Sequence, residues 1–156
     1  MILVLGLGNL LMQDDGFGPR MVELLQGYAL PPEVSLIDGG TLGLDLLPRL
    51  EAAAKVLLLD ALDRGEPPGT LFQLTAGEIP SALAQKVSLH QAGVADLLAV
   101  AELRGRLPAE LVLIGVQPQA LDIGLELSPA VAAATGGAVV AVLKQLNEWG
   151  AGSSGE

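Results

Sequence analysis

The sequence contains no cysteine and only one histidine. Disulfide bonds, thiolate zinc sites and cysteine nucleophiles are therefore excluded, and any metal site has to combine carboxylates with the single imidazole. Positive charge is scarce as well, since 8 lysine and arginine residues stand against 18 acidic residues and leave a net charge of −10. Such an acidic surface repels phosphate backbones, which argues against nucleic acid as a partner.

Segments that would target or span a membrane are missing too. Residues 1–13 are uncharged, but no basic region precedes their apolar part and two aspartates follow them at once. We therefore expect a buried strand and turn there rather than a signal peptide. The apolar segment at residues 130–143 is shorter than the roughly 20 residues that a membrane helix requires. The expected location is the cytoplasm.

Apolar residues make up 51% of the chain, which is enough to bury a core. Four short apolar runs predict buried strands at residues 1–7, 34–37, 56–59 and 111–116. One run of alternating apolar and polar residues predicts an edge strand at residues 70–74. Strands that alternate with helices indicate one three-layer α/β domain over residues 1–149, with a largely parallel sheet. The glycine- and serine-rich residues 150–156 are expected to form a flexible tail.

Helices are predicted between these strands from apolar spacing and capping residues. The first is expected to begin at Pro19 with Gly18 as its cap, and the second to cover residues 42–50 with a kink or an early end at Pro48. Residues 78–89 should be irregular or briefly helical. A Ser-x-x-Gln capping box predicts the next helix over residues 88–105, and Ser128-Pro129 opens the last one.

Acidic residues follow the predicted strands where each strand ends. They are Asp14 and Asp15 after the first strand, Asp38 at the end of the second, and Asp60 and Asp63 after the third. Ligands of open α/β sheets bind beyond the carboxyl ends of the strands, so this edge is the expected site. Taken singly, each acid also reads as a turn former or helix cap. Asp60 is harder to explain in that way, because a carboxylate that ends a buried strand needs a partner, a cation or a proton.

His90 is the single histidine, in the first turn of the helix that Ser88 is expected to cap. The positive end of the helix macrodipole disfavours imidazolium, so the ring should stay neutral and able to bind a metal. A histidine that only hydrogen-bonds at a helix start is the alternative reading. Two or three carboxylates with one imidazole form a donor set that suits nickel or zinc.

Gly6-Leu7-Gly8-Asn9 also allows a reading as a dinucleotide-binding loop, because a strand precedes it and Asp38 ends the next strand. The match is poor. Leu11 occupies the place of the third glycine, Pro19 delays the helix, and Asp38 lies about thirty residues from the glycines where about twenty is usual.

Several short motifs occur in a fixed order along the chain. They are Gly6-Leu7-Gly8-Asn9, Asp14-Asp15-Gly16-Phe17-Gly18, Asp38-Gly39-Gly40-Thr41-x-Gly43, Asp60-Ala61, Pro68-Gly69-Thr70, Ser88-x-His90-Gln91 and Gly115-x-Gln117-Pro118. This ordered set closely resembles the [NiFe]-hydrogenase maturation endopeptidases, and the resemblance covers nearly the whole chain. It implies a twisted five-stranded sheet between helices, with one antiparallel edge strand.

The resemblance also implies an activity. Members of this family recognise nickel already placed in the large-subunit precursor of a [NiFe] hydrogenase and cut off a short C-terminal peptide. Nickel would arrive with this substrate partner, although the isolated site would also take up zinc or cadmium. The alternatives are a non-catalytic nickel-sensing chaperone of the precursor and a small nucleotide-binding domain.

The family's metal-contacting positions fall on Asp15, Asp60 and His90. Asp15 is one methylene shorter than the glutamate that the family also uses, which shortens its reach. Asp38 matches a loop that bears on the substrate, together with Gly39, Gly40 and Thr41. The chemistry stays open between two forms: nickel polarises the scissile carbonyl or a water while a carboxylate acts as base, or Asp15, Asp38 or Asp60 is the base of a metal-independent, aspartic-type reaction.

Overall fold

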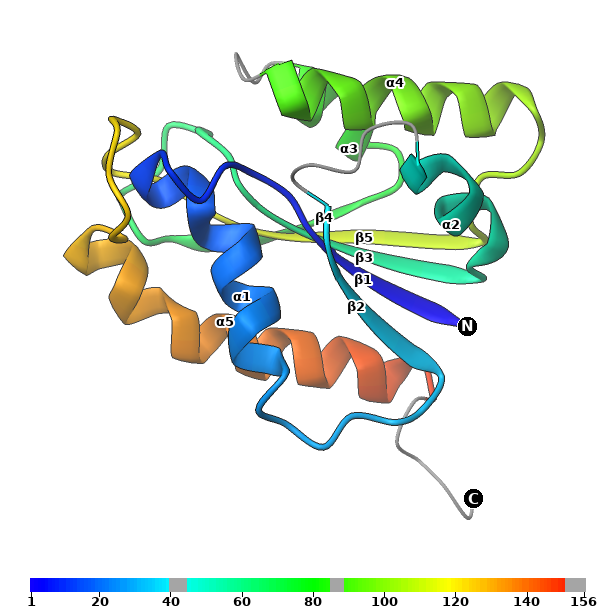
Figure 1. The fold of residues 1–156 in the computed structure, drawn as a ribbon, viewed down its shortest axis with the longest axis horizontal. Coiled ribbons are helices and arrows are strands. Elements are labelled where there is room, and N and C mark those ends of the chain that lie inside the picture. The colour runs from blue at the N-terminus through cyan, green and yellow to red at the C-terminus, as the bar shows by residue number, and fades with distance from the viewer. Residues whose placement is uncertain (40–44, 85–88, 151–156) are drawn as a thin grey trace.

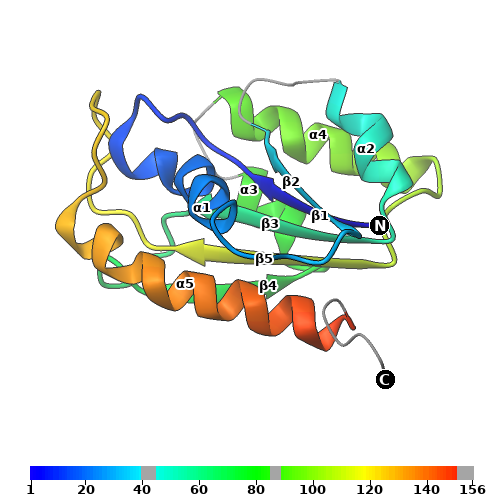
Figure 2. The ribbon, with the colours of Figure 1, turned by 60° about the horizontal axis from the view of Figure 1, so that its bottom comes forward.

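A five-stranded sheet lies between two layers of helices in the computed structural model (Figure 1 and Figure 2). The structure describes residues 1–39, 45–84 and 89–150, with the backbone alone described at residues 84 and 89–95. Side by side, the strands are β2 (Val34–Asp38), β1 (Ile2–Gly6), β3 (Lys55–Ala61), β5 (Glu110–Val116) and β4 (Leu71–Thr75). The first four run parallel, and β4 pairs antiparallel with β5. The predicted α/β fold with one antiparallel edge strand is confirmed.

The helices divide between the two faces of the sheet. One face is covered by α1 (Phe17–Leu25) and α5 (Pro129–Glu148), and the other by α2 (Leu46–Ala52), α3 (Ile79–Ala84) and α4 (Leu89–Leu103). The central strands are buried on both faces because successive side chains alternate. On β1, Val4 packs into the core under α1 and α5, whereas Leu3 and Leu5 pack into the other core.

Two prolines lie at other helix positions than the sequence predicted. α1 begins at Phe17, so Pro19 is its third residue, and α2 begins at Leu46, so Pro48 is its third residue. The first turn of a helix has no intrahelical partners for its N–H groups, and proline therefore costs little there. Neither proline marks a start or a kink. The predicted cap at Ser88 and residues 42–44 of the predicted second helix lie outside the described residues.

The last helix, α5, begins as predicted. The Ser128 hydroxyl accepts a hydrogen bond from the Val131 N–H at 3.4 Å, with proline next to the cap. Within the described ranges, α5 is the one helix long and apolar enough to cross a membrane by length and composition. It nevertheless packs as a core helix, with Val131, Val142 and Leu146 buried against the sheet.

The carboxyl ends of the parallel strands meet at one edge of the sheet. After β1 the chain continues into α1 on one face, and after β3 it continues through β4 to α3 and α4 on the opposite face. The two connections therefore diverge beyond the central strands β1 and β3. In open α/β sheets this divergence leaves the crevice in which ligands bind.

Gly136 provides a test of how α5 is packed. It lies in mid-helix, and a Cβ built on it would meet no atom within 4 Å. Gly136→Ala should raise the free energy of unfolding by about 0.5–1 kcal/mol, because alanine loses less backbone entropy in a helix. Gly137→Ala is the matched control, since its Cβ would lie 3.2 Å from Leu71 Cδ1 and the gain should be smaller. Urea denaturation measures both free energies of unfolding. A destabilised Gly136→Ala would contradict the finding that a Cβ at position 136 has room.

Candidate functional site

The segment that follows β1 forms one wall of the candidate site. A 3₁₀ turn, η1 (Gln13–Gly16), buries both of its aspartates and leads directly into α1. Its neighbour in space is β3, since the Leu7 N–H donates to the Leu59 carbonyl at 2.8 Å and η1 contacts β3. The acids that follow β1 are thereby brought to the carboxyl end of β3.

Two glycines of the first motifs allow this close approach. Gly8 has a φ of +121°, and a Cβ on it would lie 1.9 Å from the Asp15 carbonyl oxygen. A Cβ on Gly18 would lie 2.2 Å from the Leu7 carbonyl oxygen and 2.6 Å from that of Leu59. Any other residue would push η1 and the start of α1 away from the sheet. These glycines thus serve backbone packing rather than phosphate binding.

Among the predicted site carboxylates, Asp15 and Asp60 are buried. Asp15 is 6% exposed, and its Oδ2 accepts a hydrogen bond from the Asn9 N–H at 2.8 Å. Asp60 is fully buried within β3, and its Oδ1 accepts from the Ala61 N–H at 2.9 Å. Strand alternation puts Asp60 on the same face of the sheet as Leu58, beneath the layer of α2, α3 and α4. The structure therefore places Asp60 near the end of β3 and Asp15 on η1, which contacts β3.

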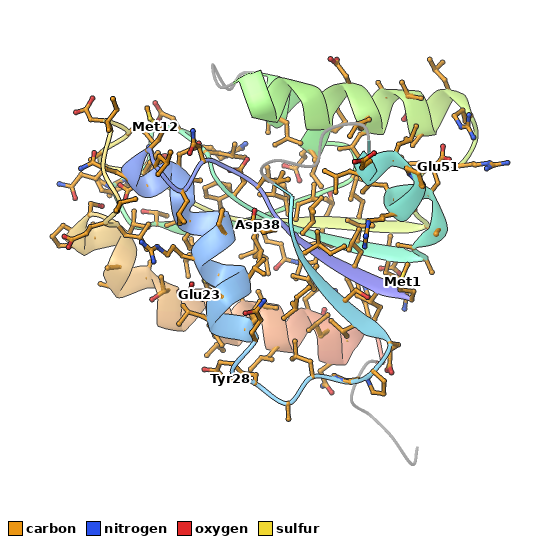
Figure 3. All side chains as sticks on the ribbon, in the orientation of Figure 1. Met1, Met12, Glu23, Tyr28, Asp38 and Glu51 are labelled. Carbon is orange, nitrogen blue, oxygen red and sulfur yellow. The ribbon has the colours of Figure 1, made fainter. Side chains whose placement is uncertain are left out.

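Asp38 and His90 approach the same edge from other elements. Asp38 is exposed at the end of β2, in register with Gly6 of β1, and the following Gly39 N–H donates to the Gly6 carbonyl at 2.8 Å (Figure 3). His90 is the second residue of α4, which starts at the carboxyl edge of the sheet (Figure 1). Its side chain lies outside the described residues, as do Gly40 and Thr41. The predicted convergence of His90 with the two buried acids stays a prediction.

No group of three acidic or histidine side chains close enough to hold a metal occurs among the side chains that the structure describes. The described carboxylates at the edge are Asp15 and Asp60, with Asp38 one strand further out on β2. A third ligand from α4 would complete a set of two oxygens and one nitrogen, which suits a borderline metal such as nickel or zinc.

Asp14 has a role that was not foreseen from its position in a turn. Its buried carboxylate accepts four hydrogen bonds of 2.7–2.9 Å from a segment at least 105 residues away in sequence. The donors are the backbone N–H groups of Gln119, Ala120 and Ser128 and the Ser128 hydroxyl. Because Ser128 is the N-cap of α5, Asp14 fixes both the loop after β5 and the start of that helix. Only the pairing of two acids after a buried strand hinted at such a role.

The pKa of Asp14 is the result of two opposing effects. Burial raises the pKa of its carboxyl, because desolvation disfavours the charged form. The hydrogen bonds from Ala120, Ser128 and Gln119 favour that form, and together they hold the pKa below its ordinary value. Asp14 is thus an ionised, fully occupied acceptor, and its role is to hold the loop rather than to react.

Gln117 organises the loop that follows β3. Its buried side chain accepts hydrogen bonds from the Arg64 and Glu66 N–H groups at 2.7 and 3.2 Å and donates to Asp63 Oδ1 at 2.9 Å. Hydrogen bonds from Gln117 and from the Gly65 N–H lower the pKa of Asp63, which is an exposed turn residue. Gln117 directly follows β5, so its position at a strand end was the signal available in the sequence.

Known proteins with this fold share much of the sequence. The profile of the family described as hydrogenase maturation protease matches residues 19–145. The hydrogenase expression/formation protein HupD of Rhodobacter capsulatus is 46% identical over 152 residues, which are 96% of this chain and 72% of that protein. The structure of the hydrogenase maturating endopeptidase HybD from E. coli matches with a TM-score of 0.91 at 39% identity, over 96% of this chain and 94% of that one. The [NiFe] hydrogenase maturation protease HybD from Thermococcus kodakarensis matches with a TM-score of 0.72 at 30% identity, over 92% and 97% of the two chains.

The fold and the acidic edge define a single-sheet α/β protein whose candidate site lies beyond the two central strands. Because the family profile matches most of the chain and a relative is 46% identical, the chain belongs to the hydrogenase maturation protease family. It is a peptidase, which is the activity that the family's description names, rather than a non-catalytic chaperone or a nucleotide-binding domain.

Replacing Asp14 tests its role as a structural acceptor. Asp14→Asn should lower the free energy of unfolding at neutral pH by about 2–4 kcal/mol, because buried N–H groups lose a charged acceptor and meet an amide NH₂. Asp122→Asn, at an exposed position of the same loop, is the matched control and should change little. Denaturation curves at several pH values measure both effects.

The same variant has a defined pH dependence. The folded-state pKa of Asp14 is lowered from an unfolded value of about 3.9, so its stabilising effect is complete above that value and is lost as the pH falls through the folded pKa. The stabilities of wild type and Asp14→Asn should therefore converge in strong acid. A difference that persists unchanged to pH 2 would contradict this role.

Proposed function

We propose that this peptidase removes a C-terminal peptide from the large-subunit precursor of a [NiFe] hydrogenase, after nickel has been placed in that precursor. The observation that carries the proposal is the position of two buried acids at the carboxyl edge of the sheet: Asp60 lies near the end of β3, and Asp15 lies on η1, which contacts β3. The name of the Thermococcus kodakarensis neighbour, which specifies [NiFe] hydrogenases, supports the substrate class. The cytoplasm is the proposed location.

In this proposal nickel belongs to the substrate. The carboxylates of Asp15 and Asp60 and the imidazole of His90 complete the coordination of a metal that the precursor already holds. The position of His90 in the first turn of α4 supports a neutral ring, because the positive end of the helix macrodipole disfavours imidazolium. Two oxygens and one nitrogen form a sparse ligand set, which suits an enzyme that has to release its product.

The end of β2 is proposed to hold the precursor chain next to this centre. Asp38 is exposed, and it lies in register with the last residue of β1. Strand β1 separates it from β3. Gly39, Gly40 and Thr41 continue this segment and would contact the backbone of the precursor. Substrate contacts on the loop and acids in the crevice would together select a loaded precursor.

Hydrolysis needs a base that removes a proton from the attacking water. Asp15, Asp60 and Asp38 are the candidate bases, because each carries a carboxylate at the edge where the scissile bond would lie. Nickel, if it polarises the scissile carbonyl or the water, supplies the electrophilic assistance. Without that assistance, the same carboxylates would carry out an aspartic-type reaction. Cleavage of metal-free precursor would exclude the first form, because that form depends on the metal.

The cleavage assay compares nickel-loaded precursor with metal-free precursor. The loaded form should be cut and the metal-free form should not, as followed by the loss of peptide mass. Asp60→Asn and Asp15→Asn should each slow cleavage by about 100-fold or more, the usual contribution of a general base or a metal-positioning ligand. Asp96→Asn, at an exposed position on α4, is the matched control and should cut normally. Equal cutting of both precursor forms would remove nickel from the recognition step.

Metal uptake by the isolated enzyme tests the ligand set without the precursor. Wild type should bind nickel, zinc or cadmium weakly, at about millimolar concentrations, in calorimetric titrations. His90→Ala should lose this binding together with cleavage and keep its thermal stability, since a ligand at a crevice adds little to the core. Lower pH should weaken binding by wild type, because a protonated imidazole has no lone pair for the metal. Full cleavage by His90→Ala would show that His90 is no ligand.

A further inference from the structure

Large apolar side chains are exposed on the two loops beside the carboxyl edge of the sheet. They are Leu10 (39% exposed), Leu11 (58%), Leu121 (44%), Ile123 (87%) and Leu125 (58%), here called the apolar loop patch. Single exposed apolar residues are common on protein surfaces and do not indicate a binding site. A group of five on two adjoining loops is the kind of surface that marks an interaction with another protein.

The two loops lie side by side because their backbones are hydrogen-bonded to each other. Met12 forms a bridge with Gly124, the Gln13 N–H donates to the Gly124 carbonyl at 2.9 Å, and the Gly124 N–H donates to the Leu11 carbonyl at 2.9 Å. Both ribbon views show the segment after β1 next to the segment before α5, and Met12 is labelled there in Figure 3. The apolar side chains of the two loops therefore belong to one surface.

Polar contacts beneath the patch hold its shape. The buried Asp14 carboxylate binds the second loop at three residues, and the Arg20 guanidinium donates to the Leu125 carbonyl. Gln13 adopts a left-handed φ of 48°, and its side-chain Oε1 accepts from the Asp122 N–H at 3.0 Å. A non-glycine residue keeps such a conformation only when its surroundings enforce it. A surface ordered in advance loses little conformational entropy when a partner binds.

The patch is also joined to the candidate site. Asp14, which anchors the second loop, and Asp15, a residue of the candidate site, are consecutive residues of η1. A partner seated on the patch would consequently be held at a fixed position relative to the crevice. This continuity favours the substrate over an unrelated protein as the occupant.

The charge of the two loops indicates which kind of partner segment would bind there. Residues 7–16 and 117–128 themselves contain no lysine or arginine, although the Arg20 guanidinium contacts the second loop at the Leu125 carbonyl. Asp122 and Glu126 are exposed in the second loop, and the whole chain carries −10. We propose that the apolar loop patch docks the hydrogenase precursor, on an apolar segment that basic residues flank and that is separate from the peptide to be cut. This inference rests on the proposed function, and it adds a second contact that anchors the substrate while the crevice carries out the reaction.

The test measures steady-state cleavage of nickel-loaded precursor by wild type and by the double variant Leu11→Asn with Ile123→Asn. The double variant should raise KM at least tenfold, equivalent to about 1.4 kcal/mol of binding free energy, and leave kcat within twofold. Leu103→Asn is the matched control: Leu103 is 88% exposed, against 87% for Ile123, and lies at the far end of α4 (Figure 1). It should leave both constants unchanged. Thermal melting confirms that all three proteins are folded.

Other outcomes separate the two proposals. If wild type fails to cut the nickel-loaded precursor, the proposed function is wrong and the docking proposal falls with it. If wild type cuts and the double variant keeps its KM within twofold, the docking proposal alone is overturned. A wild-type dimer in sedimentation velocity that the double variant abolishes, again with KM unchanged, would assign the patch to a second copy of this chain.

A second double variant tests the charge of the partner segment. Asp122→Lys with Glu126→Lys should raise KM at low salt more than at high salt, since salt screens exposed charges.

Discussion

The buried carboxylate of Asp14 joins parts of the chain that are more than one hundred residues apart. It accepts hydrogen bonds from the loop after β5 and from the residue that caps α5, while its own 3₁₀ turn lies against β3. An ionised carboxylate without these donors would be costly to bury, and the backbone N–H groups without the carboxylate would lose their partner. The candidate site and the loop beside it are thus held by the same set of contacts.

Glycine makes the same arrangement sterically possible. The backbone of η1 passes so close to Gly8, and the start of α1 so close to Leu7, that a Cβ at Gly8 or Gly18 would overlap main-chain atoms. The first motif therefore looks like a nucleotide-binding loop for a reason unrelated to phosphate. In both kinds of protein, glycine permits close backbone approach at the end of the first strand. In this chain, the approach brings carboxylates to the crevice.

Fold prediction succeeded where local pattern decides structure. Short apolar runs located β1, β2, β3 and β5, and alternation located the antiparallel edge strand β4. The start of α1 was misplaced by two residues because Pro19 was expected to begin the helix, and Pro48 was wrongly expected to kink α2 or end it early. Each is tolerated inside a first turn, and which turn position a proline occupies depends on how the helix packs against its sheet.

The sequence by itself determined the fold class and the family, and it named the candidate acids at the strand ends, because strand ends, glycines and aspartates are visible along the chain. Asp15, Asp38 and Asp60 were candidates on that basis alone. Only the tertiary structure decided that Asp14 is a clamp rather than a ligand, that Gln117 orders the loop after β3, and that two loops form one apolar surface. These roles depend on partners 51 to 114 residues away in sequence, a distance at which residue spacing carries no information about contact.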